Sequence, residues 1–167
     1  MQSVRDGSPE ALATLYARYA DRLMAVAYRL TGHAEDAEDV LHDVFLGLPE
    51  AFRRYEERGL LGPWLRQLTA RVALARMRRA TRAREVSLVG HTETTPGRGE
   101  ALEDRITLAT ALGTLPDGLR AVFVLKVIEG HSHGEIAKML GITPGASEVR
   151  LVRAMKQLRS MLGDQRQ

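Results

Sequence analysis

Apolar residues in the first third of the chain recur every three to four positions, which is the period of an amphipathic helix. The first run begins after Ser8 and Pro9, which suit an N-cap and a first helical position, and it continues to Gly32. This pattern predicts either one long helix or two helices with a bend. The second run, over about 34–48, carries its acids on the polar face, and Pro49 is expected to end or kink that helix.

The next segment is expected to be a short helical turn over 50–55 and a loop over 56–62, after which Pro63 opens a third helix. From about 85 to 100 the periodicity stops, and glycine, threonine and proline make a polar, turn-rich stretch. We interpret this stretch as a flexible linker.

Helical patterns return after the linker. Gly130 and Gly141 stand where left-handed C-cap residues belong, and Ser132 with Glu135 three residues later makes a capping box. The four expected helices cover about 101–115, 116–129, 133–140 and 144–162.

These patterns contain no alternating strand signal, so the predicted fold class is all-α. We expect two small helical domains, residues 8–84 and residues 101–163, joined by the linker at 85–100.

The segment around residue 140 has the order of a helix-turn-helix: a short helix, a glycine turn and a new helix. Small Ala137 allows close approach, Gly141 takes the positive φ of the turn, and Ile142 fills the angle between the helices. The new helix starts at Pro144, and its amino-terminal turns suit a major groove. Its outward side chains are expected to be Val149, Val152, Arg153 and Lys156. A plain αα-hairpin within a bundle is the alternative.

Composition places the chain among ordinary globular proteins: 167 residues, 44% hydrophobic and 27% charged, with no cysteine. The absence of cysteine removes disulfides and thiolate metal sites. No apolar run is long enough to span a bilayer and no signal-peptide order begins the sequence, so we expect a cytoplasmic protein without membrane insertion.

Charge is segregated along the chain although the net charge is only +3. Residues 62–84 carry seven arginines and no acid, whereas residues 35–43 carry five acids and no basic residue apart from histidine. A basic segment and an acidic segment separated in this way indicate two partners, or one partner with two faces. A solvated helix face is the simpler alternative for either segment. Trp64, beside the loop, is either a core residue or the border of a pocket for an unpaired base.

The sequence shows few features of a catalytic site. Its five histidines lie on different predicted elements, and no carboxylates stand at metal-ligand spacing beside them. No phosphate-binding glycine loop and no nucleophile elbow occur. We therefore expect neither an enzyme nor a metal site.

The chain resembles the extracytoplasmic-function (ECF) group of bacterial sigma factors, the smallest of the sigma-70 type. DAEDVLHDVF at 36–45 is similar to the acidic helix of conserved region 2, and Pro63-Trp64-Leu65 with the arginine helix is similar to its promoter-melting segment. Stretches 115–130 and 135–142 are similar to region 4 with its helix-turn-helix. The two motif sets stand in the family's order across nearly the whole chain.

The resemblance implies a promoter-specificity subunit that binds core RNA polymerase, recognises minus-10 and minus-35 promoter elements and opens the duplex. It also implies an anti-sigma factor as a partner and no cofactor. The implied core-polymerase residues are Asp39, His42 and Asp43. The implied minus-10 residues, beside the 56–62 loop, are Trp64, Arg66, Arg71, Arg78 and Arg82. The implied minus-35 residues are Glu148, Val149, Arg150, Val152, Arg153 and Lys156.

Besides Pro49, which interrupts a stretch that is usually continuous helix in the family, four positions depart from the family's common pattern. His42 stands where glutamine is common, Arg71 where asparagine is common, Ala146 where threonine is common, and Glu148 where a basic residue is common. The first two departures change the expected polymerase and melting contacts, and the last two change the promoter sequence that is read.

Two other functions use similar helices. A free-standing helix-turn-helix regulator needs a dimer interface or an effector pocket, and the first half of the sequence signals neither. A sigma-mimicking adaptor that sequesters an anti-sigma factor need not keep basic DNA-facing surfaces, which this sequence has.

Overall fold

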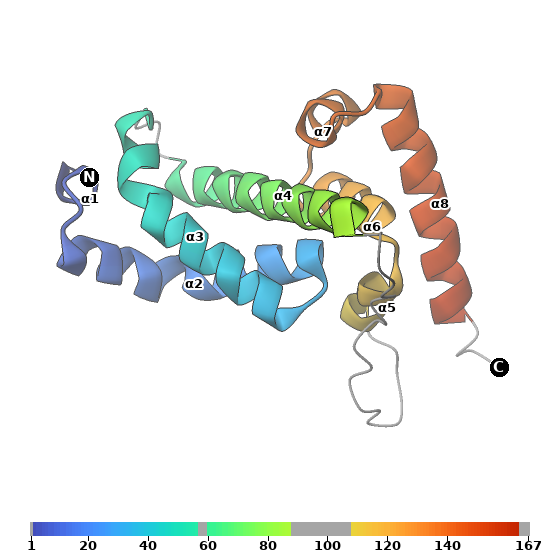
Figure 1. Cartoon of the computed structure of the whole chain (residues 1–167), viewed down its shortest axis with the longest axis horizontal. Helices are drawn as coiled ribbons and strands as arrows, with labels where there is room; N and C mark the ends of the chain where they lie inside the picture. The colour runs from blue at the N-terminus through green and yellow to red at the C-terminus, as the bar shows by residue number, and fades with distance from the viewer. Residues whose placement is uncertain (1, 57–59, 88–107, 164–167) are drawn as a thin grey trace.

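The computed structural model describes residues 2–56, 60–87 and 108–163. All regular elements within these ranges are helices, which confirms the predicted all-α class. They form an N-terminal bundle, α1–α4, and a C-terminal bundle, α5–α8, that lie against each other (Figure 1).

The N-terminal bundle is built from long helices that pack against one another and bury their apolar faces. Its elements are α1 (Gln2–Arg5), α2 (Pro9–Thr31), α3 (Ala34–Arg53) and α4 (Leu61–Ser87). The sequence pattern left two possibilities for the first helix, and α2 is a single helix. Its predicted N-cap is present, because the Ser8 hydroxyl accepts a bond from the Ala11 N–H at 3.4 Å. The short α1 was not predicted.

Helix α3 corrects the predicted boundary at Pro49. The helix runs through Pro49 to Arg53, so the separate turn expected over 50–55 is the last part of α3. Proline costs a helix one N–H bond and some strain. Burial of Leu48 and Phe52, which are both inaccessible to solvent, anchors the turns on either side of it. Tertiary packing therefore continues the helix past a local breaker.

The C-terminal bundle consists of shorter helices before a long last one. They are α5 (Leu108–Thr114), α6 (Asp117–Phe123), the π-helical η1 (Val124–Ile128), α7 (His133–Leu140) and α8 (Pro144–Gly163). The linker predicted at 85–100 falls outside the described residues except for 85–87, where α4 continues. The first residues of the helix predicted at 101–115 also fall outside them.

Local signals set the geometry of the helix-turn-helix. Gly130 and Gly141 have positive φ of 78° and 67°, and the capping box between Ser132 and Glu135 is complete. Both bonds that the Glu135 carboxylate accepts, from the Ser132 backbone N–H first and its hydroxyl second, lower the pKa of Glu135. These predictions from sequence are confirmed.

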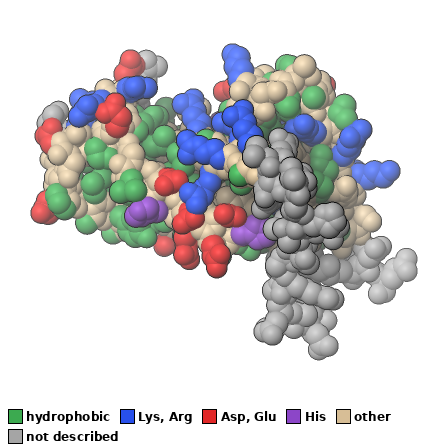
Figure 2. Space-filling model, in the orientation of Figure 1, with side chains coloured by type: hydrophobic (Ala, Val, Ile, Leu, Met, Phe, Trp, Pro, Cys, Tyr) green, Lys and Arg blue, Asp and Glu red, His purple; other side chains and the backbone are tan. Residues whose placement is uncertain are grey.

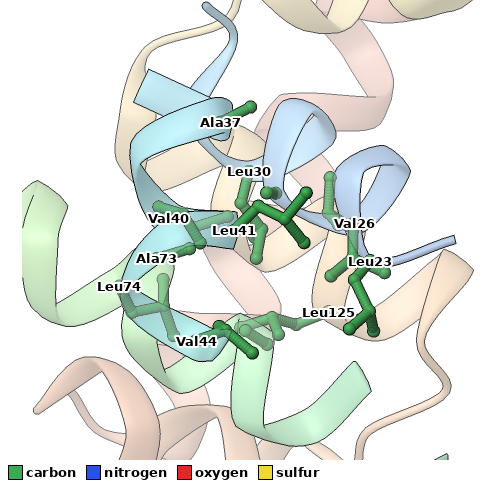
Figure 3. Close-up of a cluster of buried hydrophobic side chains, with 14 of the residues drawn as sticks. Leu23, Val26, Leu30, Ala37, Val40, Leu41, Val44, Ala73, Leu74 and Leu125 are labelled. Carbon is green, nitrogen blue, oxygen red and sulfur yellow. The ribbon is translucent and has the colours of Figure 1, made fainter. Parts of the chain in front are cut away.

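The two bundles share buried surface. Helix α2 touches α5 and α6, and α4 touches α7. The apolar cluster in Figure 3 joins side chains of α2, α3 and α4, such as Leu30, Val44 and Leu74, with Leu125 of η1. The relative placement of the candidate surfaces therefore depends on this packing.

Candidate nucleic-acid interface

The acids of α3 form a cluster with an arginine of α4. Asp39 and Asp43 lie one turn apart, and the Arg76 guanidinium binds both, with Nη1 at 3.1 Å from Asp43 Oδ2 and Nη2 on Asp39. The acids remain 57% and 42% exposed. Exposed His42 stands between them in sequence. Arg76 holds two carboxylates on neighbouring turns while leaving each open to a second cation.

Sequence reasoning placed Arg76 in the acid-free segment and gave it no partner. Its partners lie more than thirty residues earlier, on a different helix. No spacing rule within one helix finds such a pair, because i,i+4 patterns report only neighbours on the same element.

The expected arginine face is present on α4. Arg66, Arg71, Arg78 and Arg82 are exposed, and Figure 2 shows basic side chains gathered next to an acidic patch on the same face of the molecule. Two of these arginines contact the C-terminal bundle. Arg78 Nη1 donates to the Met139 carbonyl at 2.9 Å, and Arg66 Nε lies 3.8 Å from Glu129 Oε2.

Trp64 is both a packing residue of the core and part of a cavity wall, the two roles that the sequence left open. Its ring is half-buried and packs on Phe52 and Tyr55, with centroid separations of 5.2 and 4.6 Å. It also lines a cavity of about 460 Å³ together with Pro63 and Arg66. An aromatic wall beside an arginine suits a stacked base. Residues 57–59 of the predicted loop lie outside the described part of the chain.

The hydroxyl of Tyr55 is an unusual feature of this cavity wall. Tyr55 is 6% exposed, and its Oη is buried without a hydrogen-bond partner among the described residues. Buried hydroxyls are normally satisfied, because an unpaired one loses its bonds to water. This group was not predictable from sequence, since its burial comes from the meeting of α3 and α4.

Helix α8 presents most of the predicted minus-35 residues to solvent. Glu148, Val149, Val152, Arg153 and Lys156 are exposed, with Val149 at 50% and Val152 at 67%. A buried hydrogen bond holds the start of α8 against α7: Ser147 Oγ is 2.9 Å from His133 Nδ1.

Arg150 differs from the other predicted minus-35 residues. It is half-buried, and it lines an open cavity of about 360 Å³ together with Arg78 and Arg82 of α4. In this arrangement, candidates for the two promoter elements face the same space.

Within the described ranges, no group of three potential metal-ligating side chains comes together. No described helix has the length and apolarity that crossing a bilayer requires.

The structure therefore combines a helix-turn-helix in the C-terminal bundle with an exposed acidic cluster and an exposed arginine face in the N-terminal bundle, a combination typical of helical DNA-binding proteins. Family models match both halves: Sigma-70 region 2 matches residues 15–83, and Sigma-70 region 4 matches residues 105–158. The two family models match one after the other along the sequence, and together they cover most of the chain.

Relatives that match most of this chain are also sigma factors. The chain is 33% identical over 170 residues to RNA polymerase sigma factor CarQ of Myxococcus xanthus, covering 98% of this chain and 96% of that protein. It is also 33% identical over 155 residues to ECF RNA polymerase sigma factor SigE of Mycolicibacterium smegmatis, covering 89% and 60% of the two chains. A solved Bartonella quintana complex of sigma factor RpoE with the anti-sigma factor NepR has a similar fold, with TM-score 0.63, 22% identity, and coverage of 92% and 98%.

The chain belongs to the ECF group of the sigma-70 family. It is a promoter-specificity subunit whose partners are core RNA polymerase and promoter DNA, as the sequence resemblance implied. This role is a regulatory one.

Proposed function

We propose that the chain divides promoter recognition among three surfaces: the α3 acids bind core polymerase, the α4 face with the Trp64 cavity takes the minus-10 strand, and α8 takes the minus-35 duplex. One observation carries this proposal: the aromatic cavity opens beside the acid-free arginine face of α4. The domain limits 8–84 and 101–163 belong to the same proposal.

The polymerase surface consists of Asp39, His42 and Asp43. Arg76 neutralises only part of the acidic pair, because one guanidinium faces two carboxylates that remain about half exposed. A basic partner helix therefore finds two fixed acceptors one turn apart, whose rotamers Arg76 already restricts. Such preorganisation lowers the entropy cost of binding.

The minus-10 surface combines strand-holding and base-holding groups. Arg66, Arg71, Arg78 and Arg82 address phosphates along α4, whereas Trp64 and the cavity take an unstacked base. Tyr55 lines the cavity, and a turn of its ring on entry of the base would bring the buried hydroxyl, which lacks a partner among the described residues, within hydrogen-bonding reach. Stacking is tolerant of sequence, so a hydroxyl at the wall adds the discrimination that stacking lacks.

The minus-35 surface is the exposed face of α8. Glu148 stands in its first turns, where side chains reach base edges, and accepts a hydrogen bond from cytosine N4. Arg153 takes guanine, and Val149 with Val152 makes apolar contacts with thymine methyl groups. Lys156 lies on the same face, and Arg150, which is half-buried in this structure, is the remaining member of the surface.

A regulatory partner and a location follow from the same assignment. The structure of RpoE is a complex with an anti-sigma factor, and we extend this kind of partner to the present chain. Exposed Val149 and Val152 give such a partner apolar anchors on the DNA-reading face of α8. Binding to core polymerase and promoter DNA places the working protein in the cytoplasm.

The test is transcription by core polymerase on a promoter pool, with wild type, with Asp39→Asn/Asp43→Asn, and with the matched pair Glu35→Gln/Glu38→Gln on the same helix. We expect specific start sites with wild type and with the matched pair. The aspartate variant should lose core binding in a pull-down. Its fold should persist, because exposed charges contribute about 0–1 kcal/mol.

Three results contradict the proposal or part of it. Binding to an anti-sigma protein without initiation supports the adaptor function, and sequence-specific duplex binding with no dependence on core polymerase supports a free-standing regulator. Normal core retention by the folded aspartate variant rejects the α3 surface.

A further inference from the structure

Helix α3 ends in a different way from α2 and α7. Those two helices finish at Gly32 and Gly141, each with a positive φ and a backbone N–H that returns to the last turn. At the end of α3, Arg54 stays in the right-handed region with φ of −100°. The last carbonyls of a helix lack helical partners, so those of α3 are open to a donor from another part of the chain.

Arg5 of α1 supplies that donor. Its Nε donates to the Phe52 carbonyl at 3.0 Å, and its Nη2 donates to the Tyr55 carbonyl at 3.1 Å. Helix α1 lies beside this end of α3 (Figure 1), and Val4 next to Arg5 is buried in the apolar core. A guanidinium presents its donors as a fixed fork, and its charge suits the negative end of a helix. Arg5 therefore caps α3 from another helix.

The two residues that Arg5 binds also support the Trp64 ring. The Phe52 and Tyr55 rings have centroids 5.4 Å apart, and the Trp64 ring packs against both of them. These three rings form an aromatic cluster that joins the end of α3 to the first turn of α4. Because each ring contacts the other two, a shift of the backbone at the end of α3 moves Trp64 as well.

The aromatic cluster provides a wall of the cavity that the proposed function gives to an unstacked base. Tyr55 and Trp64 line this cavity, whereas Arg5 stands behind the cluster and outside the wall that the described residues form. Arg5 binds a backbone carbonyl of Tyr55, so its ring can still turn about a fixed backbone. Stacking depends on the relative placement of the two ring planes. Arg5 thus sets the position of groups that contact the base without contacting it.

We propose that Arg5 is a positioning residue for promoter opening: by capping α3 it holds the aromatic cluster in the arrangement that captures a base. The inference rests on the proposed assignment of the Trp64 cavity to the minus-10 strand. The hold of Arg5 on the cluster is measurable without DNA, so the two ideas can fail separately.

The first measurement uses the free full chain, in which Trp64 is the single tryptophan. Acrylamide quenching of its emission reports how accessible the indole ring is. Arg5→Gln removes the fork. Ser8→Ala is the matched control, because the Ser8 hydroxyl caps the start of α2 directly after α1 and does not contact the Arg5 bonds.

The second measurement uses the holoenzyme on a promoter that the wild-type protein selects from the promoter pool. Initial binding to the duplex and the rate of isomerisation to the open complex are measured separately, the latter by permanganate reactivity of thymines. Arg5→Lys is a second variant, in case Arg5→Gln folds poorly. It keeps the positive charge but loses the fork that reaches two carbonyls.

We expect Arg5→Gln to increase the acrylamide quenching of Trp64. It should slow isomerisation by about fivefold or more, which is the lower limit for loss of one stacked base. Initial duplex binding should stay unchanged, because the cluster acts only on an unpaired base. Arg5→Lys should move both readouts in the same direction by a smaller amount, and Ser8→Ala should leave both at wild-type values.

Wild-type quenching in the folded Arg5 variants shows that the cluster needs no cap and overturns the proposal. Equal changes in Arg5→Gln and Ser8→Ala also overturn it, because they show a general loss of stability. Increased quenching with unchanged isomerisation is resolved by Trp64→Leu, which keeps an apolar side chain without a stacking plane. If the Trp64→Leu holoenzyme opens promoters normally, the cavity was wrongly assigned and the proposed function fails there. If it opens them slowly, the assignment stands and the positioning role of Arg5 is rejected.

Discussion

Both bundles have apolar cores, but they differ in helix length and in how the ends of their helices are held. Helices α2, α3 and α4 have 23, 20 and 27 residues, and their contacts are mainly aliphatic and aromatic side chains with no solvent access. Helices α5, α6 and α7 have only 7, 7 and 8 residues. Their ends depend on polar groups: the bond from the Arg120 guanidinium to the Leu115 carbonyl, the Ser132 capping box and the His133–Ser147 pair.

This difference follows from helix length. A long helix buries a wide apolar face, whereas a helix of two turns leaves most of its backbone groups at its ends. The first bundle can thus present a broad charged surface on a rigid core. The second can place a few side chains with precision, which matches a division between holding phosphates and reading bases.

The largest effect that we predict is loss of the N-terminal core with Phe52→Ala. Phe52 is fully buried and packs edge-on against Tyr55 and Trp64. Its truncation should cost about 3–5 kcal/mol in free energy of unfolding. Phe45→Ala on the same helix is the control and should cost less, because Phe45 is half-buried.

Urea denaturation measures this difference, and hydrogen exchange localises it. Protection in α3 and α4 should fall more than protection in α7 and α8. An equal loss of protection across the whole chain would show that the bundles form one cooperative unit. It would contradict the contrast drawn between the two bundles.

The second prediction concerns phosphate contacts. Arg71→Ala/Arg82→Ala in the holoenzyme should weaken opening on every cognate promoter and reduce the logarithmic salt dependence of single-strand binding by about 1.4, or about 0.7 per lost contact. Arg18→Ala/Arg22→Ala on α2 is the matched control, since both arginines are exposed and lie outside the proposed DNA surfaces. An unchanged slope in the α4 variant would leave Arg71 and Arg82 as a solvated face.

Most of the helices were predictable from sequence because their signals are local. The N-cap at Ser8, the capping box at Ser132 and the turn at Gly141 each depend on residues within four positions of one another. The error at Pro49 has the opposite origin. A local helix breaker was outweighed by the burial of Phe52, which is decided by α4 and not by neighbours in sequence.

The candidate site likewise contains some features that were predictable from sequence and others that were not. The exposure of Val149, Val152, Arg153 and Lys156 on α8 followed from the helical period, whereas Arg150, a candidate only by resemblance, faces the other bundle. The Arg76 ion pairs, the buried Tyr55 hydroxyl and the Arg5 bonds arise between segments far apart in sequence. Periodicity shows which face of a helix is polar but not which element will meet it.

The third prediction tests base reading by α8. Glu148→Arg should change the preferred minus-35 sequence away from a cytosine, with a change in relative promoter use of about fivefold or more, because a good base contact gives about 1–3 kcal/mol of discrimination. A randomised minus-35 library selected with each protein measures this. Identical preferences would leave Glu148 with only a stabilising role at the helix N-terminus.

The fourth prediction concerns the polar bonds of the C-terminal bundle. Ser132→Ala removes the hydroxyl that caps α7 and should cost about 0.5–2 kcal/mol of stability. Because the folded-state pKa of Glu135 is lowered, the stability from its carboxylate is present above its ordinary pKa and is lost as pH falls through the lowered value. The stability difference between wild type and Ser132→Ala should therefore narrow at acid pH, where the bond from the Ser132 hydroxyl to the carboxylate is lost while the bond from the Glu135 N–H to that hydroxyl remains. Parallel curves would contradict the coupling.

The smallest change in stability should come from Tyr55→Phe, which removes one hydroxyl from the N-terminal bundle as Ser132→Ala does from the C-terminal one. The Ser132 hydroxyl makes bonds, whereas Tyr55 Oη is buried without a partner among the described residues. Its removal should leave the free energy of unfolding unchanged or raise it by up to about 1 kcal/mol, since an unmet desolvation cost disappears. Promoter opening should nevertheless fall on promoters whose minus-10 base the hydroxyl recognises, while binding of the minus-35 duplex stays the same. Measured together, a stable protein with altered minus-10 preference assigns the hydroxyl to the base, whereas a destabilised protein with unaltered preference shows that Oη has a structural partner instead.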